Sequence, residues 1–492
     1  MGPWLPARDD LLVTLAAAVP VAALTAVESR VAGGSGFPLD DAWIHLHFAR
    51  NLAEGAGFAY NPGRPVAGST APLWTLLLAA GASVAGPSVG LAKALGTACA
   101  VGAGVLTRRA AVAWGARPDV ALVAAVMLLW SGPVAWGALS GMEVTLAALL
   151  VAAALLAHAR GRTITAAGLA ALAPLARPEA LLLVPFLALS PRFGLKRAAV
   201  FATLTVLALA PLVAFSYATV HAPVPATAAA KIEGGLVGWL AGVHEPAGTT
   251  WLARPWEYVR AWAACLHESH PLLALTLVPG IVLAWKRVGP SLGIPALTLV
   301  AHPVGMALLA PYRAPDFQEG RYSTHLLPLA IVVAAVGLGP LVAARRWLTL
   351  LVVVALSAHG LPPAATRYAR GVDEIERMQV RLGRWVDANL PRGARLAVND
   401  IGAIAYFSRR EIVDLMGLVT PEVIPYRRQG GDAVLRFVVD VCPDYLVIFP
   451  DWFPRLAARA DLLEPLARVR LERAQVVGAA EMVVYRLRRC AL

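Results

Sequence analysis

Two adjacent carboxylates, Asp40 and Asp41, open a polar stretch that follows the first apolar segment and a Gly-rich link. Carboxylates can take a proton from a hydroxyl or bind a divalent metal through oxygen. They are costly near lipid, which favours a functional role for a pair placed beside apolar segments. The alternative is that the pair caps the helix expected to follow it, because Asp is favoured at helix N-termini. A cap, however, needs only one Asp.

Basic side chains beside later apolar segments are suited to gripping a phosphate. They are Arg177 in ARPEA, Lys231 at the end of HAPVPATAAAK and Arg321 in FQEGRY. Four other polar residues also lie beside these apolar segments: Glu143 in LSGMEV, Glu179, Glu319 and Tyr322. Together with the acidic pair, these residues suit a reaction that activates a hydroxyl and stabilises a leaving phosphate.

Each of these residues also has a structural interpretation. Arg177 and Glu179 could form an ion pair that locks two broken helices. Glu143 could favour the N-terminus of its helix, and Tyr322 could anchor the chain at the membrane interface. Lys231 and Arg321 could instead reach into lipid headgroups.

The acidic pair is followed by an amphipathic, helix-like run that carries His45, His47 and Arg50. Residues two apart on a helix point in different directions, so the two histidines are not a ready metal pair. His45 and Arg50 are candidates for substrate binding. Asp41 is the candidate ligand for a divalent metal, Mg²⁺ or Mn²⁺.

Composition identifies the elements that must position these residues. Of the 492 residues, 58% are hydrophobic and only 15% are charged, with a mean hydropathy of +0.64. Apolar runs near the length that spans a bilayer recur down to about residue 360, which predicts about ten to twelve transmembrane helices. The net charge of +12 comes with Arg clusters between apolar runs, which does not suggest nucleic acid. No P-loop or strand–GxGxxG–helix pattern predicts a nucleotide cofactor.

The basic clusters predict the orientation of the chain, since cytoplasmic loops are rich in Lys and Arg. The clusters are Arg108/Arg109, Arg160/Arg162, Arg192/Lys196/Arg197, Lys286/Arg287 and Arg345/Arg346. If successive helices cross the membrane in alternating directions, the face opposite these clusters carries a first outer loop, 31–70, a large outer loop, 221–270, and everything after 360. The stretch 71–106 is either two helices or one helix and a shallow segment, and the two short apolar runs around Arg177-Pro178 could be half-membrane segments.

A change in composition near residue 361 divides the chain into a transmembrane catalytic domain, 1–360, and a polar tail, 361–492. The tail alternates short strands with helices, with a helix expected at 453–464 and closing strands at 469–477 and 481–487. We therefore predict an α-helical polytopic membrane protein with a C-terminal soluble α/β domain. Cys442 and Cys490 in the tail could pair in an oxidising compartment or remain buried free thiols.

The sequence resembles the GT-C superfamily of membrane glycosyltransferases. The resemblance rests on DDAWI, ARNLAEGAGFAYNPG and STAPLW in the first loop, then SGME, ARPE, PATAAAK and GRY, and finally NDIGAIAYFSRREIVDLMGL in the tail. It covers nearly the whole chain and is most specific in the first loop. It lies close to the branch with mycobacterial terminal arabinofuranosyltransferases. Ala67-Gly68 and Ala226 depart from the usual pattern, which bears on the sugar and the acceptor.

The resemblance implies a polyprenyl-phosphate-linked sugar donor and a cell-envelope glycan or lipid acceptor. It places the reaction on the extracytoplasmic face of a bacterial inner (plasma) membrane, with an extracytoplasmic tail. It also implies that Asp40 is the catalytic base, with Asp41 beside it as second carboxylate or metal ligand. A transporter or lipid-linked-sugar flippase is the alternative, but it predicts two repeated halves, which the sequence lacks. A non-catalytic assembly protein would not need the paired carboxylates.

Overall fold

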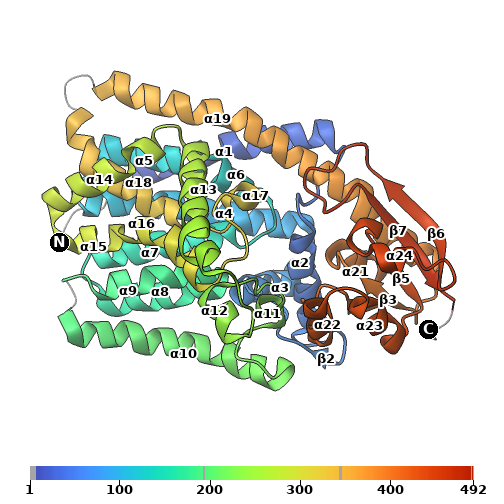
Figure 1. Cartoon of the computed structure of the whole chain (residues 1–492). Helices are drawn as coiled ribbons and strands as arrows, with labels where there is room; N and C mark the ends of the chain where they lie inside the picture. Colours follow the sequence, from blue (N-terminus) through green and yellow to red (C-terminus); the bar gives the residue numbers. More distant parts are fainter. Residues whose placement is uncertain (1–6, 192–193, 343–345, 489, 491–492) are drawn as a thin grey trace. The chain divides into compact units, whose positions relative to one another are not determined.

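The computed structural model describes residues 7–191, 194–342, 346–488 and 490, and most of them are helical (Figure 1). These residues form two compact units, each made of separate chain segments. The helical unit comprises the described residues of the segments that end at Ala26, Pro211 and Thr366. The mixed unit comprises Val27–Ala92, Leu212–Lys231 and the described residues from Arg367 onward. The expected first outer loop therefore belongs to the same unit as the polar tail.

Four long helices pass from one unit into the other: α1 (Ala7–Val31), α4 (Val89–Ala113), α10 (Gly194–Val220) and α19 (Arg346–Ile375). The other main helices of the helical unit are α5 (Pro118–Leu129), α6 (Gly132–Leu139), α7 (Val144–Ala159), α8 (Thr163–Ala176), α9 (Leu183–Ala188), α12 (Gly235–Leu240), α13 (Arg254–Ser269), α14 (Leu273–Val288), α15 (Pro290–Ala296), α16 (Thr298–Leu309) and α18 (Leu327–Leu338). Their Ala- and Leu-rich sequences combine high helix propensity with an apolar surface.

Six helical segments of the described chain are long and apolar enough to cross a membrane, or up to eight if two bent pairs each count as one span. Shorter apolar helices include α7, α8 and α3 (Pro72–Ala85). These shorter helices account for the difference from the ten to twelve spans expected. The stretch 71–106 forms two helices, α3 and α4, separated at Gly86. The chain is a multi-pass membrane protein.

The core of the helical unit forms where small residues let helices approach closely. Helix α7 is buried along almost its whole length and packs on α8, while α18 packs on α14. A Cβ at Gly337 of α18 would lie 2.4 Å from the carbonyl oxygen of Gly280 in α14. Glycine is therefore required at this contact, a pattern typical of membrane helix pairs.

The first basic cluster is bound by acidic residues near the start of the chain. The buried guanidinium of Arg108 donates to Asp9 at 3.0 Å and to Asp10 at 2.8 Å, and Arg109 also pairs with Asp10. Of the other basic residues used to predict orientation, Arg192 and Arg345 lie outside the described residues. Which face of the membrane they occupy stays a prediction.

The mixed unit is built around a five-stranded sheet with the strand order β4-β3-β5-β7-β6. Strands β3 (Arg395–Val398), β4 (Glu411–Asp414) and β5 (Tyr445–Ile448) are parallel. Strand β7 (Glu481–Leu487) pairs antiparallel with β5, and β6 (Leu463–Arg470) pairs antiparallel with β7. The helices of this unit are α2 (Asp40–Ala53), α3, α11 (Ala226–Ala230), α20 (Arg381–Asn389), α21 (Gly402–Ser408), α22 (Ile424–Gln429), α23 (Ala433–Val441) and α24 (Pro454–Ala457). The predicted α/β tail with parallel pairing is confirmed.

Two expected tail elements were wrong. The helix expected at 453–464 is only the single turn of α24, and the strand expected at 469–477 is instead β6, which starts at Leu463. Strand β6 pairs with β7 from Leu463↔Leu487 to Arg470↔Glu481. This pairing joins two segments of the tail, so the start of β6 within the expected helix could not be predicted from the local pattern alone.

Cys442 and Cys490 form a disulfide, with their Cα atoms 5.5 Å apart. Of the two interpretations left open by the sequence, pairing is therefore correct. Cys99 and Cys265 remain free thiols, and Cys265 is buried.

Candidate functional site

The two candidate catalytic carboxylates occupy the first turn of α2, where the helix dipole favours negative charge. The N-cap residue of α2 is Leu39, and no side chain caps this helix. Both Asp40 and Asp41 are half-buried. The idea that the pair caps its own helix is therefore wrong.

Asp40 instead binds the start of another helix of the mixed unit. One carboxylate oxygen accepts the backbone N–H of Gly402 at 2.7 Å, and the other accepts that of Ala403 at 2.8 Å. Both donors lie in the first turn of α21, so the side chain joins the first-loop helix to the tail. Only glycine fits at position 402, since a Cβ there would lie 2.1 Å from the Asp40 carbonyl oxygen.

Burial raises the pKa of Asp40 well above its ordinary value, and the negative charge of Asp400 raises it further. The two backbone hydrogen bonds oppose this shift but do not cancel it. A carboxyl with a raised pKa is a stronger base once ionised, which suits proton removal near neutral pH.

Asp400 is a third carboxylate that sequence reasoning did not select. It follows β3 and accepts a hydrogen bond from Gln379 at 2.8 Å. Burial raises its pKa to about 6, and the charge of Asp41 adds to the effect. A signal was present in the sequence, because Asp400 lies in the NDIG run, at the carboxyl end of a parallel strand where ligand sites tend to form.

The other predicted residues on α2 hold the mixed unit together. Arg50 donates to the carbonyl of Tyr406 in α21 at 2.6 Å and contacts His47 at 3.0 Å. Its guanidinium also lies 4.6 Å from the centre of the Tyr406 ring. His45 contacts Thr75 of α3 at 3.2 Å. The two histidines therefore have different partners, as their spacing predicts.

A second group of predicted residues lies in the helical unit, centred on a buried ion pair. Arg177 donates to Glu143 at 2.5 Å and to Glu179 at 3.1 Å. The side chains of Arg177 and Glu143 are only 7% and 2% exposed. Arg177 follows α8 at the break before the 3₁₀ helix η1 (Pro178–Leu182). The structural ion pair that locks the broken helices is thus the interpretation that the contacts favour.

Tyr322 lies beside both basic residues of this group. Its ring centre is 4.3 Å from the guanidinium of Arg177 and 5.1 Å from that of Arg321, which also donates to the Tyr322 hydroxyl at 3.2 Å. Arg321 is buried, so it does not extend into lipid headgroups.

The chain just before Arg321 is strained. Gln318 and Glu319 both have positive φ, at 49° and 59°, in the short segment α17 (Phe317–Gly320). Side chains with a Cβ rarely adopt this conformation, and such strain clusters at functional sites. Glu319 is half-buried.

The predicted site residues thus fall into two sets. Asp40, Asp41, His45, Arg50 and Lys231 belong to the mixed unit, where Lys231 ends α11 and is half-buried. The helical unit contains Glu143, Arg177, Glu319, Arg321 and Tyr322. In the helical unit, Arg177, Glu143 and Tyr322 are in direct contact.

The expected metal site does not fit the described side chains. No group of three or more His, Cys, Asp or Glu residues in the described part of the chain could hold a metal ion. A divalent cation at Asp41 would therefore have too few protein ligands, because such ions are usually held by several oxygens.

Comparisons with known proteins agree on the fold. Residues 372–485 match the family described as "Domain of unknown function (DUF8728)". No curated protein matches the chain. The crystal structure of ArnT from Cupriavidus metallidurans bound to undecaprenyl phosphate is similar, with a TM-score of 0.60 and 14% identity over 95% of this chain and 97% of that one.

The oligosaccharyltransferase of Archaeoglobus fulgidus is also similar. Its apo structure has a TM-score of 0.60 and 13% identity, over 90% of this chain and 70% of that one. The archaeal oligosaccharyltransferase AglB from the same organism, in complex with an inhibitory peptide and a dolichol-phosphate, has a TM-score of 0.57 and 12% identity over 91% and 70%. The chain has the fold of these structures, which agrees with the fold that the GT-C resemblance of its sequence implies.

Proposed function

We propose that the chain is a membrane glycosyltransferase. It transfers a sugar from a polyprenyl-phosphate-linked donor to a cell-envelope glycan or lipid acceptor. The reaction inverts the anomeric carbon, and Asp40 is the general base. The observation that carries this proposal is the Asp40 carboxylate, which binds the first turn of α21 and whose pKa is raised by burial and by the charge of Asp400.

The fold supports a lipid-linked donor. The similar ArnT structure is bound to undecaprenyl phosphate, and the similar AglB structure is in complex with a dolichol-phosphate. Both ligands are polyprenyl-type phosphates, which are the leaving groups that the proposed reaction releases. A donor of this kind already carries its leaving group, so the enzyme needs no nucleotide site.

In the proposed step, Asp40 takes the proton of the acceptor hydroxyl as the oxygen attacks the anomeric carbon. A bond forms between that oxygen and the anomeric carbon, while the bond from this carbon to the phosphate oxygen breaks. The polyprenyl phosphate leaves with the electron pair, and Asp40 ends protonated. A carboxylate has about four lone-pair sites, so its two amide bonds leave acceptor capacity for this proton.

Arg321 is the residue that we assign to the leaving phosphate. Tyr322 holds its guanidinium, and the strained turn at Gln318 and Glu319 sets the position of the segment. Arg177 is a weaker candidate, since it is paired with Glu143 and Glu179. Lys231 remains a second candidate for phosphate contact, and His45 and Arg50 are assigned positioning roles.

We place the reaction on the extracytoplasmic face of the inner membrane. The Cys442–Cys490 disulfide supports an oxidising compartment for the tail, because disulfides are rare in the cytosol. Asp40 is bound to the tail within the mixed unit, so the two share one compartment.

The test is to supply the purified, reconstituted protein with a panel of polyprenyl-phosphate sugars and candidate envelope acceptors. The proposal predicts a glycosylated acceptor and free polyprenyl phosphate, both identified by mass. Movement of the lipid between leaflets without transfer would indicate a flippase instead. Neither transfer nor movement across the panel would contradict both functions.

A further inference from the structure

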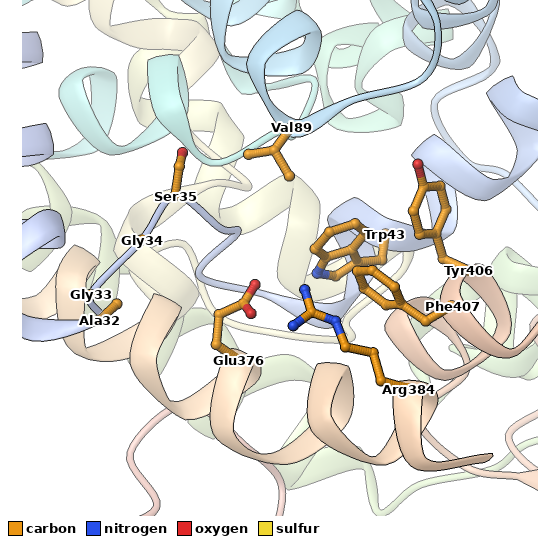
Figure 2. Close-up of a pocket in the computed structure, with 10 residues that line it drawn as sticks. All are labelled: Ala32, Gly33, Gly34, Ser35, Trp43, Val89, Glu376, Arg384, Tyr406 and Phe407. Carbon is orange, nitrogen blue, oxygen red and sulfur yellow. The ribbon is translucent and has the colours of Figure 1, made fainter. Parts of the chain in front are cut away.

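A pocket of about 490 Å³ lies within the mixed unit (Figure 2). Its wall is formed by the Gly-rich link after α1, by α2, by the helix that runs into α20, and by α21. The lining residues that matter for its chemistry are Gly34, Trp43, Glu376, Arg384, Tyr406 and Phe407. None of them has a role in the proposed transfer step.

Three aromatic rings form one side of this pocket. The Trp43 ring centre lies 5.0 Å from that of Tyr406 and 4.9 Å from that of Phe407, and the last two are 5.2 Å apart. Trp43 is only 3% exposed, and Tyr406 and Phe407 are half-buried. Such a cluster offers apolar ring surface to a ligand without a large loss of side-chain freedom.

The facing polar groups are Arg384 and Glu376. Arg384 is exposed, and its guanidinium lies 5.0 Å from the centre of the Phe407 ring. Among the described residues it makes no hydrogen bond or ion pair, so its five N–H donors remain available. Figure 2 shows this guanidinium between the Glu376 carboxylate and the aromatic rings.

Trp43 and Gly36 add two further constraints. The indole N–H of Trp43 is buried and has no hydrogen-bond partner among the described residues, and Figure 2 shows it on the ring edge that faces Arg384 and Glu376. Buried donors are rarely left unpaired, so the N–H points to an acceptor that a ligand supplies. A Cβ at Gly36 would lie 2.7 Å from a Glu376 oxygen, so the Gly-rich link fits closely against this carboxylate.

This combination of groups distinguishes between ligand classes. Aromatic rings beside planar polar side chains suit a sugar ring, which has apolar C–H faces and hydroxyls at its edge. Arg384 and Trp43 would donate to those hydroxyls, and Glu376 would accept from them. The two charged side chains cancel, so the pocket favours a neutral ligand over a phosphate, which Glu376 would repel.

We propose that this pocket is a subsite that binds one neutral sugar unit of the acceptor glycan. The assignment to the acceptor rests on the proposed function, whereas the binding of a neutral sugar does not. The acceptor would then be held by the same unit that carries Asp40.

The direct test measures the binding of neutral sugars to the purified protein by saturation-transfer NMR. The probes are methyl glycosides and linear trisaccharides of arabinose, galactose, glucose and mannose, with inorganic phosphate as the anionic probe. We expect one of these sugars to bind. Arg384→Ala, Phe407→Ala and Glu376→Gln should each weaken its affinity about tenfold, because each removes one good contact. Arg381→Ala is the matched control on the same helix, because Arg381 is exposed and does not line the pocket. It should bind like the wild type.

Three results would overturn the inference. These are no binding of any sugar in the panel, equal binding by wild type and Arg384→Ala, or tighter binding of inorganic phosphate that Glu376→Gln strengthens. The transfer assay separates this inference from the proposed function. If transfer occurs and Arg384→Ala keeps the wild-type KM for the acceptor, the subsite fails alone. If no donor is used but sugar binding still depends on Arg384, only the transferase function fails.

Discussion

The carboxylate of Asp40 accepts two amide hydrogen bonds and still has a raised pKa, because burial and the charge of Asp400 outweigh those bonds. Asp400 shows the same balance, with a pKa of about 6 despite its bond from Gln379. Grouped acidic side chains with raised pKa values are typical of sites that exchange protons. The sequence identified Asp40 and Asp41, but it gave no reason to pair them with a residue some 360 positions away.

Asp414, at the end of β4, allows this electrostatic account to be tested through stability. It is fully buried, and burial raises its pKa to about 6 although it accepts the backbone N–H groups of Met416 and Val419. The folded state therefore binds a proton more tightly than the unfolded state, whose Asp titrates near pH 4. Wild-type stability should fall by roughly 1–3 kcal/mol relative to Asp414→Asn as the pH rises from about 4 to about 7.

Urea unfolding of the purified chain across this pH range, for the wild type and Asp414→Asn, measures that difference. Asp414→Asn has its own constant cost, because its amide cannot accept all of the backbone bonds. Only the change with pH is therefore diagnostic. A difference that is flat, or that grows in favour of the wild type as the pH rises, would mean that Asp414 is not destabilised by burial.

At the scale of elements, the sequence predicted those features that arise from local patterns. Apolar runs predicted the membrane helices, and short apolar blocks predicted a tail in which strands alternate with helices, with a closing strand at 481–487 that is β7. The strand β6 was misplaced because its position depends on pairing with β7, a non-local contact. The capping of α21 by Asp40 was likewise unpredictable, since it joins segments far apart in the chain.

Substitution of Arg177 tests whether this residue, at the break after α8, has a structural or a phosphate-binding role. Replacing it with Ala leaves Glu143 buried without its cation, which should destabilise the protein by roughly 3–5 kcal/mol. We expect Arg177→Ala to melt at a lower temperature in a thermal unfolding assay. Replacing both partners, as in Arg177→Met with Glu143→Met, should recover much of the loss because the Glu143 carboxylate is then no longer left buried without a cation.

The opposite pattern would restore Arg177 as a phosphate-binding residue. In that case Arg177→Ala would melt like the wild type but would lose use of the lipid-linked donor. Arg321→Ala provides the comparison, because it should impair donor use more than acceptor use.

At the scale of the whole molecule, each unit is assembled from segments that the linear sequence separates. The mixed unit combines the first outer loop, the end of α10 with α11, and the tail. The change in composition near residue 361 lies close to Arg367, where the last segment of this unit begins. Composition cannot show that residues 27–92 join that segment, because their membership rests on specific contacts such as the Asn61–Ile412 hydrogen bonds.

The disulfide predicts the compartment of the mixed unit. Cys442 and Cys490 are 48 residues apart, and Cys442→Ser should lower the stability of the tail by roughly 2–5 kcal/mol. In intact cells, a membrane-impermeant maleimide should label these two cysteines only after an external reductant has been added. Cys265 is buried and serves as the unreactive reference in the same chain. Labelling that requires cell lysis would place the tail in the cytosol and would contradict the proposed orientation.

The central claim is that Asp40 removes the acceptor proton, and the pH dependence of sugar transfer tests it most directly. With the polyprenyl-phosphate sugar that the wild type uses, the transfer rate should rise with pH through the raised pKa of Asp40 and then level off. Asp40→Asn should be slower by about 10²–10⁴-fold, the usual contribution of a general base, and its residual rate should lack that rise. An Asp40→Asn protein that transfers sugar at nearly the wild-type rate, with the same pH profile, would contradict the account.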